Sequence, residues 1–361
     1  KASDEEPFPE RVYEDRGIQV YSNRPVTVSC AIICEGTGTA FKVHPVQFIG
    51  KEYIVAAYNE DPMFREAWEN YFPSQVTITA PFEQTKVSFT LGGNGYTETA
   101  GGMSPGQTKQ ATLNAGDVWM IMTKGENSDL SGSVISANKP VAVVAGNQCA
   151  NIPTGNQWCN HVSNMLSPMD RWGKQYHVPP IPGKETPPII RVFAQEKDTK
   201  VYRDGRQVSH IPNVGGIQAK GFQEMRMHPK EMEPHPVVIS GDKPIGVTFY
   251  NTGAQESGYP LHPGNPFIMP LVPQSAYSYE LILSEPGTES KKLFNENYLH
   301  LIYESDDSGS VSDDIKYAEG DDTNWVKVRD KFPSKGEPFD YDINGKKYAV
   351  KTLTINPTGP I

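Results

Sequence analysis

Three stretches of the sequence share one pattern: VYSNRPVTV at Val20–Val28, ISANKPVAV at Ile135–Val143 and ISGDKPIGV at Ile239–Val247. In each, Asn or Asp is followed by a basic residue, proline and an apolar run. Asn and Asp favour turns, and proline fixes φ just before the apolar run. The pattern therefore predicts three strand-turn-strand hairpins, whose prolines lie 115 and 104 residues apart.

Other residues recur in phase with these prolines, which indicates a tandem repeat with a period close to one small β domain. A third copy at Pro273–Leu281 keeps the spacing but lacks the glycine. The matched sets are Pro45, Gly50 and Tyr53 against Pro168, Gly173 and Tyr176, and Ala80–Val87 against Ala194–Val201.

Composition agrees with an all-β fold. The 361 residues include 32 Gly and 31 Pro, and short apolar runs rich in β-branched residues lie between them, as is typical of sandwiches and small barrels. We expect three tandem, related β-sandwich-like domains with short helical insertions at Asp61–Pro73 and Gln157–Leu166. The predicted boundaries are an N-terminal extension at 1–16 and domains at 17–148, 149–256 and 257–361.

The phase of the repeat leaves the place of residues 17–34 open. They belong either to the first domain or to the C-terminal domain, where they would supply a hairpin and cover an exposed sheet edge. In the second case the pairing partner is Tyr298–Ile355 of the same chain or of a neighbouring copy. A related hypothesis pairs Lys1–Arg16 with a neighbour.

Charge argues against a nucleic-acid partner. Lys and Arg number 33 against 43 Asp and Glu, for a net charge of −10, and no basic cluster stands out for phosphate binding. Every apolar stretch is far shorter than the roughly 18 residues that cross a bilayer, so we expect no transmembrane segment. Lys1 is not preceded by an apolar leader, which fits a cytoplasmic chain or a secreted one whose signal peptide has been removed.

The four cysteines lack the paired CxxC spacing of a structural zinc site. Cys149 and Cys159 bracket a turn-rich stretch that a disulfide would close easily, in an oxidising compartment. Two buried thiols are the alternative. Cys30 and Cys34 would lie about 13 Å apart in an extended strand, so a bond between them requires a turn or bulge, and free thiols are equally compatible with the sequence.

The stretch from Asp129 to Pro180 resembles the IgGFc-binding protein N-terminal domain family, strongly over about 50 residues and weakly over most of the chain. The family shows a similar succession of LxGxxIxSxKPVAVxxG, Cys, CxH and PxxxWGxxYxVxP. The matching residues are Leu130, Gly132, Ile135, Lys139, Pro140, Val141, Ala142, Val143, Gly146, Cys149, Cys159, His161, Pro168, Trp172, Gly173, Tyr176 and Val178.

The resemblance implies a secreted or surface-displayed protein with a disulfide between Cys149 and Cys159. Two departures matter. Ala137 stands where the family has Ser, and Asn160 stands where an acidic residue is usual between the second Cys and the His. Antibody binding is therefore not carried over from the family to this chain.

Signatures of catalysis and of metal binding are weak. No His pair has metal-ligand spacing, and no nucleophile elbow or phosphate-binding loop occurs. The acidic run near Tyr303 contains Asp306, Asp307, Asp313 and Asp314, whose oxygens suit calcium, although a solvated acidic loop is the simpler interpretation. We expect no cofactor.

The sequence thus favours a secreted or cell-surface, non-enzymatic adhesive or structural module that binds a protein, a glycan or other copies of itself. One alternative is a self-assembling subunit of an extracellular filament or surface layer. The other is a hydrolytic, carbohydrate-active enzyme on a β scaffold, in which carboxylates such as those of Glu280 and Asp314 would converge.

Overall fold

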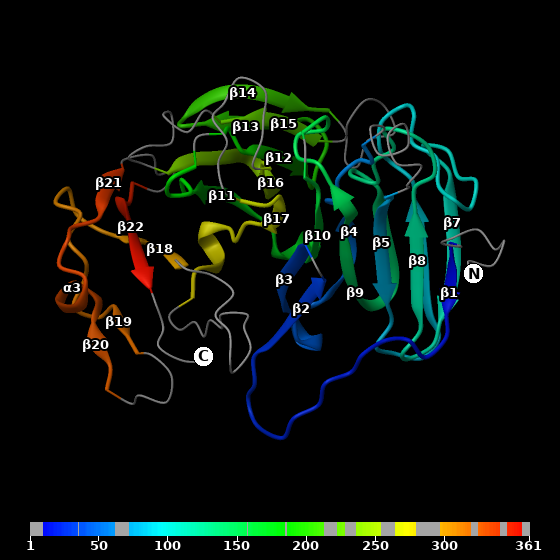
Figure 1. The fold of residues 1–361 in the computed structure, drawn as a ribbon, viewed down its shortest axis with the longest axis horizontal. Coiled ribbons are helices and arrows are strands. Elements are labelled where there is room, and N and C mark those ends of the chain that lie inside the picture. The colour runs from blue at the N-terminus through cyan, green and yellow to red at the C-terminus, as the bar shows by residue number, and fades with distance from the viewer. Residues whose placement is uncertain are drawn as a thin grey trace.

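The computed structural model shows a nearly all-β protein made of two similar units, a separate hairpin and a third region (Figure 1). It describes residues 10–34, 36–61, 72–156, 158–184, 186–212, 222–227, 236–253, 264–278, 297–318, 324–339 and 345–355, without the side chains of Cys34 and Asn297.

The second unit repeats the strand order of the first, except that β1 has no counterpart in it. In the first unit the order is β1-β8-β5-β9-β6-β7, and β4 and β10 also pair with β9. In the second unit, read from the corresponding edge, the order is β15-β12-β16-β13-β14, and β11 and β17 also pair with β16. The first unit comprises β1 (Arg11–Tyr13), β4 (Gly50–Ile54), β5 (Ser74–Thr79), β6 (Thr85–Thr90), β7 (Thr108–Leu113), β8 (Val118–Met122), β9 (Val134–Ala150) and β10 (Asn160–Met165). The second comprises β11 (Gly173–Val178), β12 (Ile189–Ala194), β13 (Thr199–Arg203), β14 (Arg206–Ile211), β15 (Phe222–Arg226), β16 (Val237–Asn251) and β17 (Phe267–Pro270).

The proline motifs at Pro140 and Pro244 are equivalent, but the expected hairpins are wrong. Each motif lies inside one long strand, β9 or β16. The first part of β9 pairs with β4 and β6, and its second part pairs with β5 and β10. In the same way, the first part of β16 pairs with β11 and β13, and its second part pairs with β12 and β17. The proline thus marks a bend at which a central strand passes from one set of partners to the next.

The residues before each proline explain the motif. Asn138 Oδ1 accepts a hydrogen bond from the amide of Lys86 at 2.8 Å, and Asp242 Oδ1 accepts one from Lys200 at 2.8 Å. The following lysines, Lys139 and Lys243, donate to carbonyls of the turns before β6 and β13. Proline has no N–H to donate to a ladder, so it fits a point where the regular pairing is interrupted.

The recurrent tyrosine holds the same bend in both units. Its hydroxyl is buried, donates to a carbonyl just after the proline and accepts an amide hydrogen three residues before itself. The bonds are Tyr53 Oη to Val141 O (2.7 Å), Gly50 N to Tyr53 Oη (2.8 Å), Tyr176 Oη to Ile245 O (2.6 Å) and Gly173 N to Tyr176 Oη (3.1 Å).

The recurrent glycine and proline join one unit to the next. A Cβ atom on Gly50 would lie 2.4 Å from Pro168 Cβ, and one on Gly173 would lie 2.6 Å from Pro273 Cβ. Each proline precedes a 3₁₀ turn, η2 (Met169–Arg171) or η3 (Gln274–Ala276). The phase of the repeat is therefore set partly by packing between units, where any side chain larger than hydrogen would clash.

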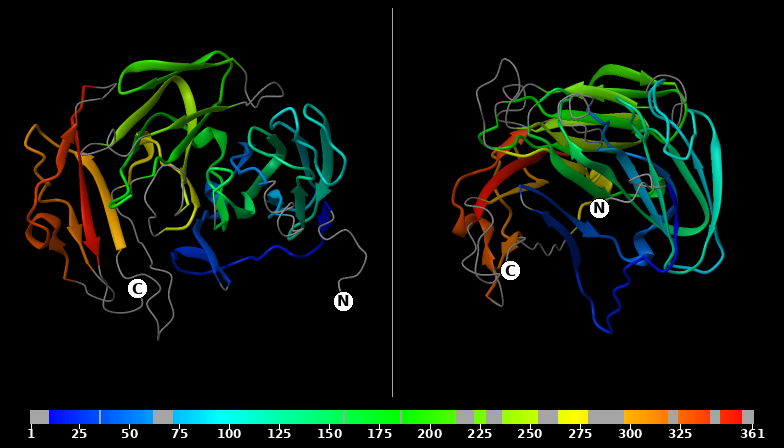
Figure 2. Two further views of the ribbon diagram at one scale, coloured as in Figure 1. Left: turned by 45° about the horizontal axis from the view of Figure 1, so that its top comes forward. Right: turned by 45° about the vertical axis from the view of Figure 1, so that its right-hand side comes forward.

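The N-terminal stretch differs from the expectations. β1 pairs with β8 of the same chain, so part of the predicted extension belongs to the first unit. β2 (Val28–Cys34) pairs with β3 (Thr37–Val43), and the described residues show no pairing of β2 with the C-terminal strands. The chain between β1 and β2 is exposed and runs outside both units (Figures 1 and 2).

The third region has a smaller, different sheet in the order β18-β22-β21, from β18 (Asn297–Glu304), β22 (Tyr348–Ile355) and β21 (Glu337–Phe339). β19 (Lys316–Tyr317) pairs with β20 (Val326–Lys327), which leads into the short helix α3 (Val328–Lys331). Phe339, Tyr348 and Val350 pack against Val238 of the second unit. The described strands do not repeat the order of the two units, and a third tandem domain stays a prediction.

One of the two predicted helical insertions is wrong, and the other is not described by the structure. Residues 62–71 lie outside the described residues. Gln157–Leu166 is not helical where it is described, because β10 pairs with the end of β9 from Asn160 onward. This pairing satisfies backbone groups and buries Val162 and Met165, and it overrides the local preference of the sequence. Among the described residues, no helix is long and apolar enough to cross a membrane.

A buried arginine lies between the two units. Arg191 on β12 is 4% exposed, and its Nη1 donates to the carbonyl of Ala57, to Asp129 and to Ser131 of the first unit at 2.9–3.0 Å. Its Nε donates to Glu224 of β15 at 3.0 Å. Burial alone lowers the pKa of Arg191, but the carboxylate of Asp129 and its other neighbours raise that pKa overall, so the guanidinium stays charged.

We predict that Arg191→Met lowers the free energy of unfolding by about 3–5 kcal/mol, because it leaves Asp129 buried without a cation. Arg329→Met is the control, since Arg329 pairs with Asp313 at the surface and such pairs contribute about 0–1 kcal/mol. Urea titration measures both. Equal effects of the two variants would contradict a structural role for Arg191, and Arg191→Met/Asp129→Asn should recover part of the loss.

Candidate functional site

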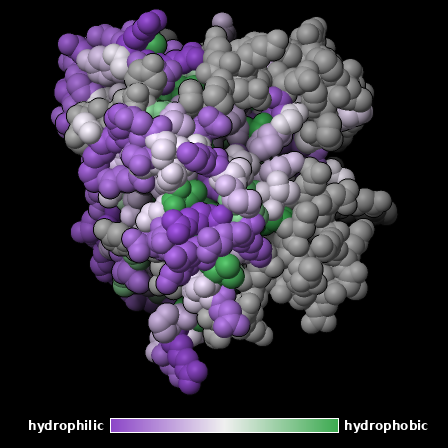
Figure 3. Space-filling view, turned by 90° about the vertical axis from the view of Figure 1, so that its left-hand side faces the viewer, coloured by the Kyte–Doolittle hydropathy of each residue, from purple (hydrophilic) through white to green (hydrophobic). Residues whose placement is uncertain are grey.

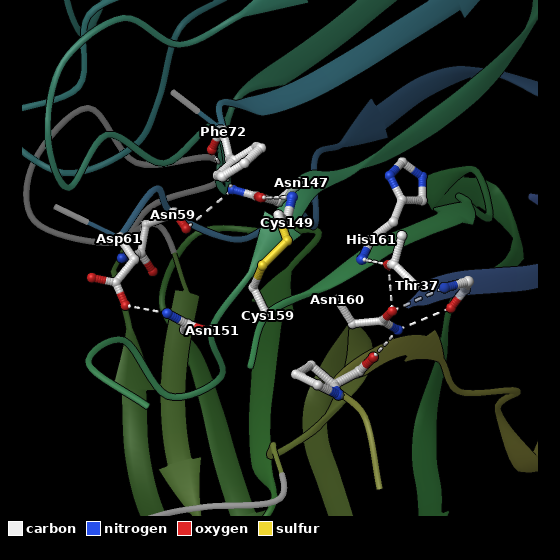
Figure 4. Close-up of a disulfide and its surroundings, with 12 residues drawn as sticks. Thr37, Asn59, Asp61, Phe72, Asn147, Cys149, Asn151, Cys159, Asn160 and His161 are labelled. Carbon is white, nitrogen blue, oxygen red and sulfur yellow. Dashed lines mark hydrogen bonds between the residues drawn. A yellow bond between two sulfur atoms is a disulfide. The ribbon is translucent and has the colours of Figure 1, made fainter. Parts of the chain in front are cut away.

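A disulfide closes the loop between β9 and β10. Cys149 and Cys159 are bonded, with Cα atoms 5.1 Å apart, and Figure 4 shows the bond between the ends of the two strands. Cys30 has a free thiol. β2 pairs with β3 in unbroken register through Cys30 and Cys34, so the strand lacks the turn or bulge that a bond between these two cysteines requires.

Side chains from the stretch after β4 hold the loop from one side. Asp61 Oδ2 accepts a hydrogen bond from Asn151 Nδ2 at 2.9 Å (Figure 4). It also accepts one from the amide of Gly155 at 2.7 Å. Asn59 donates to Thr154 Oγ1 at 2.7 Å. Because the carboxylate receives two donors from different parts of the loop, it fixes the loop conformation as well as its position.

Asn147, fully buried on β9, connects this anchor to the disulfide. Its Nδ2 atom donates to the carbonyls of Tyr58, Asn59 and Phe72 at 3.1–3.3 Å, and its Oδ1 accepts from the amide of Cys149 at 2.8 Å (Figure 4). One amide side chain therefore provides hydrogen-bond partners for backbone groups on both sides of the loop, and buried polar groups generally have such partners.

Asn160 connects the other end of the disulfide loop to the hairpin and to the second unit. Its Oδ1 accepts from Thr37 Oγ1 at 2.6 Å and from the amide of Gly38 at 3.0 Å, and its Nδ2 donates to the carbonyls of Gly38 and Pro266 at 2.9 and 2.8 Å. A carboxylate has no hydrogens to donate. The Asn at this position, where the family usually has an acid, thus suits these particular neighbours.

Trp158 is a large side chain that the loop presents to solvent. It is 59% exposed, next to Cys159, and its φ is 64°. Residues other than glycine seldom adopt this left-handed conformation, and it clusters at functional sites. Thr154 and Gly155 are exposed on the same loop. The anchored loop therefore holds an aromatic side chain outward, in an arrangement suited to contact a partner.

Sequence reasoning missed Trp158 as a candidate. The available signal was an aromatic residue directly beside a cysteine in a short, turn-rich loop without the alternation that would bury it. Among the histidines, the backbone amide of His161 donates to Thr37 Oγ1 at 2.6 Å, whereas His177 is buried against Tyr277, Phe339 and Tyr348. In the ranges that the structure describes, no three His, Cys, Asp or Glu side chains are placed to hold a metal.

The four candidate calcium ligands have separate partners. Asp306 accepts from Ser308, which lowers its pKa; Asp313 pairs with Lys327 and Arg329, and the hydrogen bond from Lys327 chiefly lowers its pKa. Asp307 pairs with Lys347, and Asp314 accepts from Ser312. Calcium binding there stays a prediction. Glu280, the suggested catalytic partner of Asp314, lies outside the described residues.

Comparison with known sequences identifies the family to which this chain belongs. The chain belongs to the IgGFc-binding protein family, whose sequence model, described as IgGFc binding protein, matches residues 39–360. The human IgGFc-binding protein is 26% identical over 277 residues, which is 76% of this chain and 5% of the human protein. No solved structure matches. The family resemblance found in the sequence is thus confirmed.

We predict that reducing the disulfide, or the Cys149→Ser/Cys159→Ser variant, lowers the free energy of unfolding by roughly 2–3 kcal/mol, because a loop of about ten residues regains freedom in the unfolded chain. Cys30→Ser is the control and should have little effect. Mass spectrometry of a non-reduced digest checks the bond itself, and finding both thiols unpaired would contradict the assignment.

Stability should also decrease as the pH falls from about 7 to 5. Burial lowers the pKa of His161 below its usual value of about 6.5, so the folded state binds the proton more weakly than the unfolded state. The associated stability is present above pH 6.5 and is lost as the pH falls toward the folded pKa. His161→Gln should reduce the difference between urea midpoints at the two pH values. An unchanged difference would show that other groups, such as His44, cause it.

Proposed function

We propose that this chain is an extracellular, non-enzymatic adhesive module that binds a protein or glycan partner through the Cys149–Cys159 loop. The observation that carries this proposal is the exposed Trp158 on a loop held by a disulfide and by Asp61. Tryptophan is among the residues that contribute most to binding energy at interfaces. A partner meeting a loop that is already ordered gains affinity, because less freedom is lost on binding.

Membership of a family named for a binding protein supports a binding role, and the disulfide supports an oxidising, extracellular location. The name of the human relative states that it binds IgG Fc. The present chain covers only a twentieth of that protein, so Fc is a first probe for this chain and not its assigned ligand.

The test compares two tryptophans of matched exposure. Trp158 is 59% exposed on the loop, and Trp325 is 57% exposed in the third region. The chain is immobilised and probed with human IgG Fc and with a glycan array. For any ligand that binds, Trp158→Ala should weaken the affinity at least about tenfold, equivalent to about 1.4 kcal/mol, whereas Trp325→Ala should leave it unchanged.

Two results would contradict the proposal. One is an equal effect of the two substitutions on a bound ligand, which would place the binding surface elsewhere. The other is a ligand whose affinity Trp325→Ala weakens more than Trp158→Ala does. Circular dichroism and the unfolding midpoint of each variant establish that the fold is intact.

A further inference from the structure

Residues 17–28 have the sequence of a central strand but lie in the environment of an exposed linker. Val20 and Val26 are 60% and 61% exposed. The residues at the same positions of the motif are fully buried in β9 and β16, where they form the centre of each unit's core. These counterparts are Ile135 and Val141 in β9, and Ile239 and Ile245 in β16.

The exposed apolar surface extends beyond these two positions. Ile18 is 94% exposed and Tyr21 is 89% exposed. The same short segment therefore presents four large apolar side chains to water. Exposed apolar side chains gathered on one short segment mark an interaction site in soluble proteins, and an exposed segment outside any sheet is available for addition to the edge of another sheet.

Several core residues of the third region are partly exposed among the residues that the structure describes. The region's buried cluster includes Tyr303, Val311 and Leu353, but Leu299 and Leu301 of β18 are only half-buried against it. Other half-buried members of this cluster are Ile315, Tyr317, Phe332 and Ile355. The two repeated units bury most of their core residues fully. The outward face of the third region is mainly hydrophilic, with small separate hydrophobic patches (Figure 3).

The charges of the two parts are complementary. Residues 17–28 contain one arginine, Arg24, and no acidic residue. Residues 297–355 contain twelve acidic and eight basic residues, a net charge of −4. Opposite net charges favour encounter of the two surfaces and fix their orientation.

We propose that residues 17–28 of one chain dock as an added strand on the β18-β22-β21 sheet of a second copy. The segment is anchored at both ends beside the first unit, by β1 on β8 and by the β2–β3 hairpin on Asn160. The third region lies on the other side of the second unit (Figures 1 and 2). Docking between copies joins different surfaces and is head-to-tail, so it continues from copy to copy.

The first experiment measures association of the full-length chain by sedimentation equilibrium. Val20→Asp/Val26→Asp is compared with Val208→Asp/Val272→Asp, which adds the same charge at exposed valines outside the segment (46% and 57% exposed). The wild type and the control should associate, and higher salt should weaken the association. The segment variant should raise the dissociation constant at least about tenfold without changing the unfolding midpoint.

The second experiment identifies the surface that the segment contacts. A photoreactive phenylalanine analogue replaces Tyr21, and isotope-labelled and unlabelled copies are mixed before irradiation. We expect mixed-isotope cross-links between position 21 and residues 297–355. A wild type that is monomeric at roughly 100 μM, where micromolar complexes are mostly formed, would overturn the proposal. So would cross-links confined to one copy, or mixed-isotope cross-links that fall only in the two repeated units.

Discussion

The buried guanidinium of Arg191 is the interaction on which the arrangement of the molecule depends. It is charged, it lies between two units that are otherwise separate sheets, and it contacts the rings of Tyr58, Phe222 and Tyr250 as well as Asp129. A charge in such a place is tolerated only when its partners are correctly positioned. Relative rotation of the units would break these contacts together, so the ion pair favours one orientation.

A short series of contacts connects Arg191 to the disulfide loop. Arg191 donates to the carbonyl of Ala57 and contacts Tyr58, and Asn147 holds the carbonyls of Tyr58 and Asn59. Asn59 and Asp61 then hold the disulfide loop. Burial raises the pKa of Tyr58 to about 12, so this ring remains neutral beside the arginine at physiological pH. The order of the exposed loop thus depends on contacts buried between the units.

Much of the fold was predictable from the sequence, because the repeat shows which residues of the two units are equivalent. It does not show the conformation that those residues adopt. The phase of Pro140 with Pro244, and of Tyr53 with Tyr176, correctly aligned two units in which β4–β10 correspond to β11–β17. An Asn-Lys-Pro sequence suits a hairpin turn as well as a bend within one strand. Only the pairing partners of the strand distinguish the two, and the sequence does not show those partners. β10 was missed because its pairing is tertiary. Arg191 was missed because its counterpart in the first unit is Thr77, so the repeat pattern gave no sign of it.

The features proposed for function lie where the two units differ. Cys149 of the first unit corresponds to Gly253 of the second, so the second unit cannot form the same closed loop. Arg191 replaces Thr77, and the exposed Val26 stands where Val141 and Ile245 are buried. Positions shared by both copies are accounted for by the bend, the tyrosine bond and the close approach of glycine to proline. Since these shared positions already specify the strand order that both units have, the unshared positions are free to join the units, to order the loop and to contact partners.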